Sequence, residues 1–128
     1  MIDLSNFPVH HLGIAVASSD FDLLARNKEI NYDEVQGVRT IFEPHPLFDC
    51  YIEYFTTTGR ASNYKTGFNH VCYNIENREA FENQIAKWKS QGIGIQVTRI
   101  EESGSPQCNF VVFCFISGIG IVEFNIND

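Results

Sequence analysis

Polar and apolar residues alternate with a period of two in two stretches of the chain, residues 10–16 and residues 67–75. Because successive side chains of a β-strand point to opposite faces, each stretch predicts a strand with one apolar face. A shift of 59 residues lays His11 of the first stretch on His70 of the second. A repeat of this kind predicts a protein built from two similar halves.

The second half contains a clear helix pattern. Phe81, Ile85 and Trp88 lie at the i, i+4, i+7 spacing of a helix that packs one stripe on a sheet. Asn77 is suited to cap the start of this helix, and Gly92 is suited to end it. The corresponding helix of the first half is predicted to be short.

The remaining elements follow the same order in each half. The predicted elements are strand 7–17, helix 21–28, strands 35–43 and 49–56, strand 67–75, the helix after residue 77, and strands 93–100, 109–116 and 120–126. With a further short strand near 29–32, both halves fit a β-α-β-β-β order. We therefore predict one α+β domain over residues 1–128, with modules at about 7–58 and 67–127.

Composition narrows the classes of partner. The chain has 128 residues, 44% of them hydrophobic, and a formal net charge of −7, so we expect a folded domain with a real core. Nucleic acid and acidic membrane surfaces are excluded as partners because no basic stripe is visible. No apolar run approaches the ~20 residues of a membrane span, and no signal peptide is visible, so we expect a cytoplasmic protein. The four cysteines form no Cys-x-x-Cys pair and are interpreted as free buried thiols.

Each half also places one carboxylate inside its last strand, Glu53 in the first half and Glu123 in the second. A carboxylate in an apolar strand is costly unless it is paired, exposed or bound to a metal. Either Glu, or a single strand histidine such as His11 or His70, is most often an ordinary structural residue. The joint pattern of one His and one Glu per half is different, because two facing halves would gather a donor set that suits a divalent metal.

Four segments resemble the vicinal oxygen chelate superfamily, which includes glyoxalase I and methylmalonyl-CoA epimerase. They are His11-Leu12-Gly13-Ile14-Ala15-Val16, Gln36-Gly37-Val38, Gly67-Phe68-Asn69-His70-Val71-Cys72-Tyr73 and Gly120-Ile121-Val122-Glu123-Phe124. The resemblance implies a sheet of paired modules curled around a metal. It also implies that two copies of the chain form a homodimer.

The resemblance maps the metal ligands to His11, Glu53, His70 and Glu123, with a divalent ion (Ni, Co, Zn, Mn or Fe(II)) as cofactor. His10 is the competing candidate in the first strand. Strand alternation predicts that His10 points to the face opposite His11, and the family motif favours His11.

For function, the resemblance implies proton transfer at a carbon next to a carbonyl. An epimerase or isomerase acting on a small molecule such as an acyl-CoA thioester comes first. A glyoxalase-like lyase comes second, and a non-catalytic small-molecule-binding protein is the alternative from another class. Glu123 is the first candidate for the catalytic base and Glu53 the second, because Thr40 stands where some epimerases have another acid. Cys72 is interpreted as a pocket or core residue rather than a nucleophile.

Overall fold

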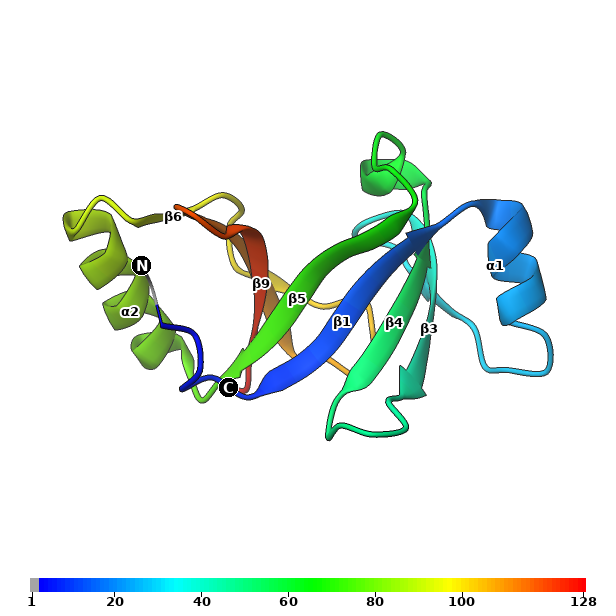
Figure 1. The fold of residues 1–128 in the computed structure, drawn as a ribbon, viewed down its shortest axis with the longest axis horizontal. Coiled ribbons are helices and arrows are strands. Elements are labelled where there is room, and N and C mark those ends of the chain that lie inside the picture. The colour runs from blue at the N-terminus through cyan, green and yellow to red at the C-terminus, as the bar shows by residue number, and fades with distance from the viewer. Residues whose placement is uncertain (1–2) are drawn as a thin grey trace.

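The computed structural model of the chain describes residues 3–128 and contains one nine-stranded sheet with an α-helix at each end (Figure 1). The elements are β1 (Val9–Val16), α1 (Ser18–Leu24), β2 (Asn31–Asp33), β3 (Val38–Pro44), β4 (Tyr51–Thr56), the 3₁₀ turn η1 (Gly59–Ala61), β5 (Gly67–Ile75), α2 (Arg78–Ser90), β6 (Gly94–Gln96), β7 (Glu101–Glu102), β8 (Phe110–Ile116) and β9 (Gly120–Ile126). Neither helix in this described part is long and apolar enough to cross a membrane.

The order of strands in the sheet is symmetric about its centre. The order is β2-β3-β4-β1-β5-β9-β8-β6, and β7 pairs with β8. In each half the first strand lies parallel to the last one, β1 to β4 and β5 to β9, while β1 and β5 pair antiparallel in the middle. The sheet does not close on itself, and in Figure 1 it curls away from β1 and β5 on both sides. The predicted α+β curled sheet is confirmed.

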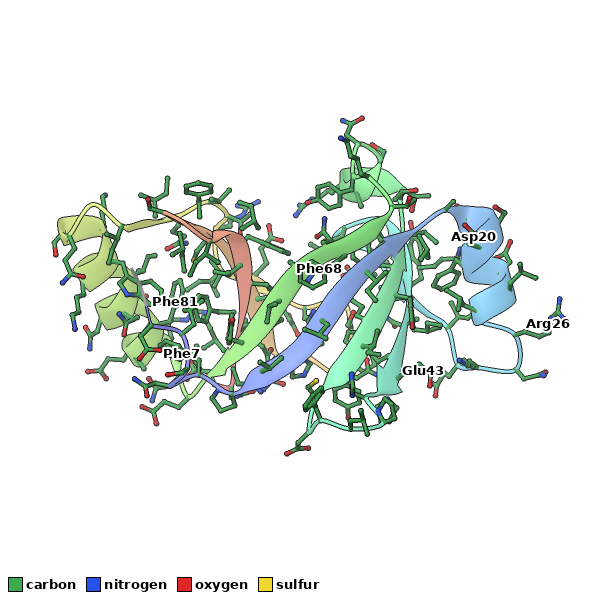
Figure 2. All side chains as sticks on the ribbon, in the orientation of Figure 1. Phe7, Asp20, Arg26, Glu43, Phe68 and Phe81 are labelled. Atoms are coloured by element: carbon green, nitrogen blue, oxygen red, sulfur yellow. The ribbon has the colours of Figure 1, made fainter. Side chains whose placement is uncertain are left out.

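Helix α2 packs its apolar stripe on the second half of the sheet. Phe81 and Trp88 are buried, and their rings lie 5.8 Å and 5.9 Å from the ring of Phe124 on β9. Phe7, from the segment before β1, lies beside α2 in Figure 2, and its ring is 5.6 Å from that of Phe124. Asn77 caps the helix as predicted, because its side chain accepts a backbone N–H of the first turn at 2.8 Å.

Helix α1, at the opposite end, differs from its prediction in position. It begins at Ser18 rather than Phe21 and ends at Leu24. Phe21 is fully buried and packs in a cluster with Ile41 of β3, so this one side chain anchors the short helix to the sheet. Shortly after the helix, Asn27 adopts a positive φ of 63°, the left-handed conformation that prevents the chain from continuing as a helix.

The predicted strand 93–100 is wrong for most of its length. Within this segment only β6 forms a regular ladder with β8. Directly after β6, the amides of Val97 and Thr98 both donate to the carbonyl of Phe113, at 2.9 Å and 3.2 Å. Two residues that face a single residue of the neighbouring strand form a β-bulge. This bulge interrupts the hydrogen bonding to β8, which β7 resumes further along the chain. The other predicted strands agree with the structure to within three residues at either end.

Candidate metal centre

The four predicted ligands meet where the two halves of the sheet join, one from each of the central strands β4, β1, β5 and β9. The Nε2 atoms of His11 and His70 are 3.3 Å apart. Glu123 Oε1 lies 3.0 Å from the first of these nitrogens and 3.1 Å from the second. Glu53 Oε1 lies 3.4 Å and 3.9 Å from the same two atoms. The structure therefore brings together all four residues that the sequence singled out.

Strand register explains why they meet. Gly13 pairs with Glu53 on one side and with His70 on the other, and Cys72 pairs with Glu123 across β5 and β9. The imidazole of His70 lies directly over Gly13, where any Cβ would collide with the ring. A glycine inside a strand often marks such a close approach, so Gly13 makes room for one ligand of the cluster.

A β-bulge in β1 changes the position of His10. Val9 pairs with Tyr73 and His11 with Cys72, so His10 is an extra residue with no partner opposite. The Nδ1 atoms of the two adjacent histidines are only 2.7 Å apart. The prediction that His10 points to the face opposite His11 is wrong, because the bulge breaks the alternation on which it depended.

Hydrogen bonds fix which nitrogen of His11 carries its hydrogen. His10 Nε2 lies 2.8 Å from the carbonyl oxygen of Gln107, and because a carbonyl only accepts, this nitrogen donates. Burial, together with the charge of His11, lowers the pKa of His10 and favours its neutral form. Nδ1 of a neutral His10 then accepts from Nδ1 of His11. His11 therefore carries hydrogen on Nδ1 and turns Nε2 toward the other ligands.

His70 is held in the same way. Its Nδ1 donates to the side-chain oxygen of Asn69 at 2.7 Å, which leaves Nε2 facing the cluster. The Nε2 atoms of both histidines thus converge on the carboxylates of Glu53 and Glu123, and the two carboxylates need a positive charge among them. In the metal-free chain the raised pKa of His11 favours a second proton, which supplies that charge. Two imidazole nitrogens and two carboxylates also fit a divalent transition metal, with their outer nitrogens already bonded as metal-binding histidines require.

Burial and charge give the two carboxylates different properties. Burial alone would raise the pKa of Glu123, but hydrogen bonds from His11 and His70 outweigh it and hold that pKa well below its usual range. Burial alone would lower the pKa of His11, but the hydrogen bond to Glu123 and the charges of both carboxylates raise it. Burial is also the largest influence on Glu53 and raises its pKa. Glu123 is therefore firmly ionised, while Glu53 takes up a proton more readily.

The Sγ atom of Cys72 lies within 4.8 Å of ring nitrogens of His10 and His11. Burial raises the pKa of Cys72 well above its usual value, so it is a thiol, in agreement with its interpretation as a core residue. All four cysteines are free; Cys72 and Cys114 are buried, whereas Cys50 and Cys108 are only half-buried. The expectation of four buried thiols is therefore correct for two of them.

The structure adds supporting residues that sequence patterns did not indicate. The segment 103–109, between β7 and β8, crosses to the first half of the chain. There Gly104 accepts from the side chain of Asn31 at 2.9 Å, and Gln107 accepts from His10. No periodicity or spacing marks such a carbonyl. Asn69 had one available signal, its position directly before a predicted ligand.

The fold and the cluster at its centre agree with the resemblance seen in the sequence. An open sheet of two repeated halves, with one His and one Glu from each half at their junction, is the arrangement that the resemblance to the vicinal oxygen chelate superfamily implied. No protein-family model matches the chain, and no curated protein matches its sequence.

Solved structures of methylmalonyl-CoA epimerases match the fold. The enzyme from Mycobacterium tuberculosis matches with a TM-score of 0.69 and 17% identity, over 98% of this chain and 91% of that chain. A variant of the Streptomyces coelicolor enzyme, in complex with 2-nitronate-propionyl-CoA, matches with a TM-score of 0.61 and 16% identity, over 92% and 95%. An epimerase in complex with methylmalonyl-CoA and NH4+ gives 0.59 and 16%, over 92% of each chain. At these identities the likeness establishes the fold alone, which is the fold of these epimerases.

Proposed function

We propose that this chain is a divalent-metal-dependent enzyme that transfers a proton at a carbon next to a carbonyl, as an epimerase or isomerase does. The observation that carries the proposal is the meeting of two Nε2 atoms and two carboxylates in a buried cluster. Here the Nδ1 hydrogens of His11 and His70 are turned outward, to His10 and Asn69.

Glu53, His11, His70 and Glu123 would hold the ion, and their mixed nitrogen and oxygen donors suit Ni, Co, Zn, Mn or Fe(II). When bound, such an ion polarises a carbonyl oxygen and thereby acidifies the adjacent carbon. The chain itself supplies ligand orientation through His10 and Asn69. It also limits the access of water, because His11 is only 1% exposed.

The contacts of the two carboxylates support Glu53 as the base, the reverse of the order favoured by the sequence. Glu123 has two contacts of 3.0 Å and 3.1 Å and a side chain 5% exposed, so it is anchored. The contacts of Glu53 are 3.4 Å and 3.9 Å, and its side chain is 13% exposed. A carboxylate with longer contacts and more exposure turns more easily toward a substrate, accepts its proton and returns it.

The matched structures support the epimerase class over the alternatives. Their names describe methylmalonyl-CoA epimerases, with methylmalonyl-CoA or 2-nitronate-propionyl-CoA bound in two of them. A glyoxalase-like lyase is the second candidate, favoured by one residue. The resembled bacterial glyoxalases have glutamate at the position of Glu53. The resembled epimerases commonly have glutamine there, which cannot accept a proton, so a base at Glu53 would distinguish this chain from them.

Solvent-deuterium exchange tests the proposal. Metal-loaded chain is incubated in D2O with small carbonyl compounds that carry one α-hydrogen, with and without a CoA tail, and exchange is followed by proton NMR. We expect metal-dependent exchange, slowed by about 10²-fold or more in Glu53→Gln, the scale of a lost general base. Glu82→Gln, at an exposed position on α2, is the matched control and should exchange normally. Exchange that is absent from the whole panel, despite bound metal, would favour a non-catalytic binding protein.

A further inference from the structure

A cavity of about 150 Å³ lies between the two halves of the chain. The first half contributes the segment 33–36 and residues around η1, and the second half contributes β7, β8, β9 and the segment before β7. Its apolar walls are formed by Val35, Tyr64, Val97, Val111, Phe113 and Ile121. A cavity of this volume accommodates a group about the size of a benzene ring against these apolar walls.

One side chain connects this cavity to the His/Glu cluster. None of the four candidate ligands lines the cavity, but the ring of Phe113 does, and it packs edge-on against His70 with ring centroids 5.5 Å apart. Phe113 also pairs with Glu123 across β8 and β9. Phe113 therefore lies between the cavity and the His/Glu cluster, so the two sites are neighbours.

The charges around the cavity oppose an anionic ligand. Asp33, Glu101 and Glu102 line it, and within the described part of the chain Arg60 is the only cation in the lining. Arg60 is already paired with Glu101 at 3.1 Å, and Arg99 contacts the same carboxylate at 3.5 Å from outside the lining. The lining therefore offers no unpaired cation to a phosphate group. Its excess of acidic side chains has the same sign as the net charge of the whole chain, −7, and both repel anions.

We propose that the cavity holds the apolar substituent of a small carbonyl substrate without phosphate groups, and that a CoA thioester is not the preferred substrate. This inference rests on the proposed function, since the carbonyl end is placed at the His/Glu cluster. It separates this chain from the matched epimerase structures, two of which hold CoA derivatives.

Three probes test the inference on zinc-loaded full-length chain by isothermal titration calorimetry. Acetohydroxamate and benzohydroxamate offer the same two oxygen donors, but only the second carries an apolar ring. Propionyl-CoA carries the phosphates. We expect benzohydroxamate to bind roughly 10-fold or more tightly than acetohydroxamate, the gain expected from burying the ring. We expect propionyl-CoA to bind more weakly than benzohydroxamate.

Two matched variants locate the effect. Val97→Asp places a carboxylate in the cavity wall and should abolish the preference for benzohydroxamate. Ile95→Asp places one two residues away, outside the lining, and should preserve it. Both positions are about half exposed, at 53% and 52%, so either variant is expected to fold.

The outcomes separate this inference from the proposed function. Failure of the chain to take up zinc when it is loaded for this experiment would refute the metal-dependent function. With zinc bound, three results would overturn the cavity proposal alone: equal or undetectable binding of the two hydroxamates, an unchanged preference in Val97→Asp, or tighter binding of propionyl-CoA.

Discussion

Replacing His10 by alanine tests whether the residue next to a candidate ligand orients that ligand. In the structure His11 donates from Nδ1 to Nδ1 of His10 at 2.7 Å, and His10 donates in turn to Gln107. His10→Ala removes the acceptor in a site where His11 is only 1% exposed. His11 then either keeps an unsatisfied buried N–H, which costs about 1–3 kcal/mol, or moves its hydrogen to Nε2 and loses the lone pair that faces the cluster.

Both outcomes weaken metal binding. We expect the affinity for zinc or nickel to fall about 10- to 100-fold, the usual effect of losing such a partner, which corresponds to about 1.4–2.8 kcal/mol. His10→Gln retains a side-chain acceptor and should recover much of the affinity. His45→Ala changes a histidine whose ring bonds to the amides of its own turn, so this variant should bind metal as the wild type does.

The assay is competition with a chromophoric chelator, combined with long-range ¹H–¹⁵N NMR of the histidine rings. The NMR spectrum of wild-type, metal-loaded chain should show the hydrogen of His11 on Nδ1. Unchanged affinity in His10→Ala, with the same tautomer of His11, would refute the reasoning.

Three further predictions follow from the same structure. Gly13→Ala should lower the free energy of unfolding by about 1–3 kcal/mol in urea denaturation, because its Cβ meets the ring of His70; an unchanged midpoint would contradict the packing. In the metal-free chain the raised pKa of His11 adds stability that is complete below about pH 6.5 and is lost as pH rises through the folded-state value, so the melting temperature should fall from pH 6 to pH 8.5; a rise would contradict that pKa direction. Light scattering should give twice the 14.6 kDa mass of the chain, since an open sheet with exposed Ile95 and Phe115 has edges and apolar surface to cover; a monomer at micromolar concentration would count against the dimer.

The sequence predicted the parts of the fold and site that depend on periodicity. His11 and His70 lie on long alternating strands, and the repeat placed Glu53 and Glu123 at matching positions, so their meeting followed from register. Alternation also explains the error at His10, because a bulge inserts one residue without changing composition.

Long-range backbone contacts were beyond prediction. The carbonyl of Gln107 reaches His10 from a segment 97 residues further along the chain, and no local pattern encodes that approach. The choice between Glu53 and Glu123 as base likewise depends on contact lengths and exposure, which strand patterns do not contain. Gly13 was a usable signal that was not used, since a glycine inside a strand implies a close neighbour.

The most direct test of the central claim is the stoichiometry of metal binding. Metal-free chain, prepared with a chelator and then dialysed, is titrated with zinc or nickel by isothermal titration calorimetry, and bound metal is counted by elemental analysis. The account predicts one ion per chain for the wild type and none for the double variant His11→Ala/His70→Ala, which retains both carboxylates. No uptake by the wild type, or equal uptake by the double variant, would contradict it.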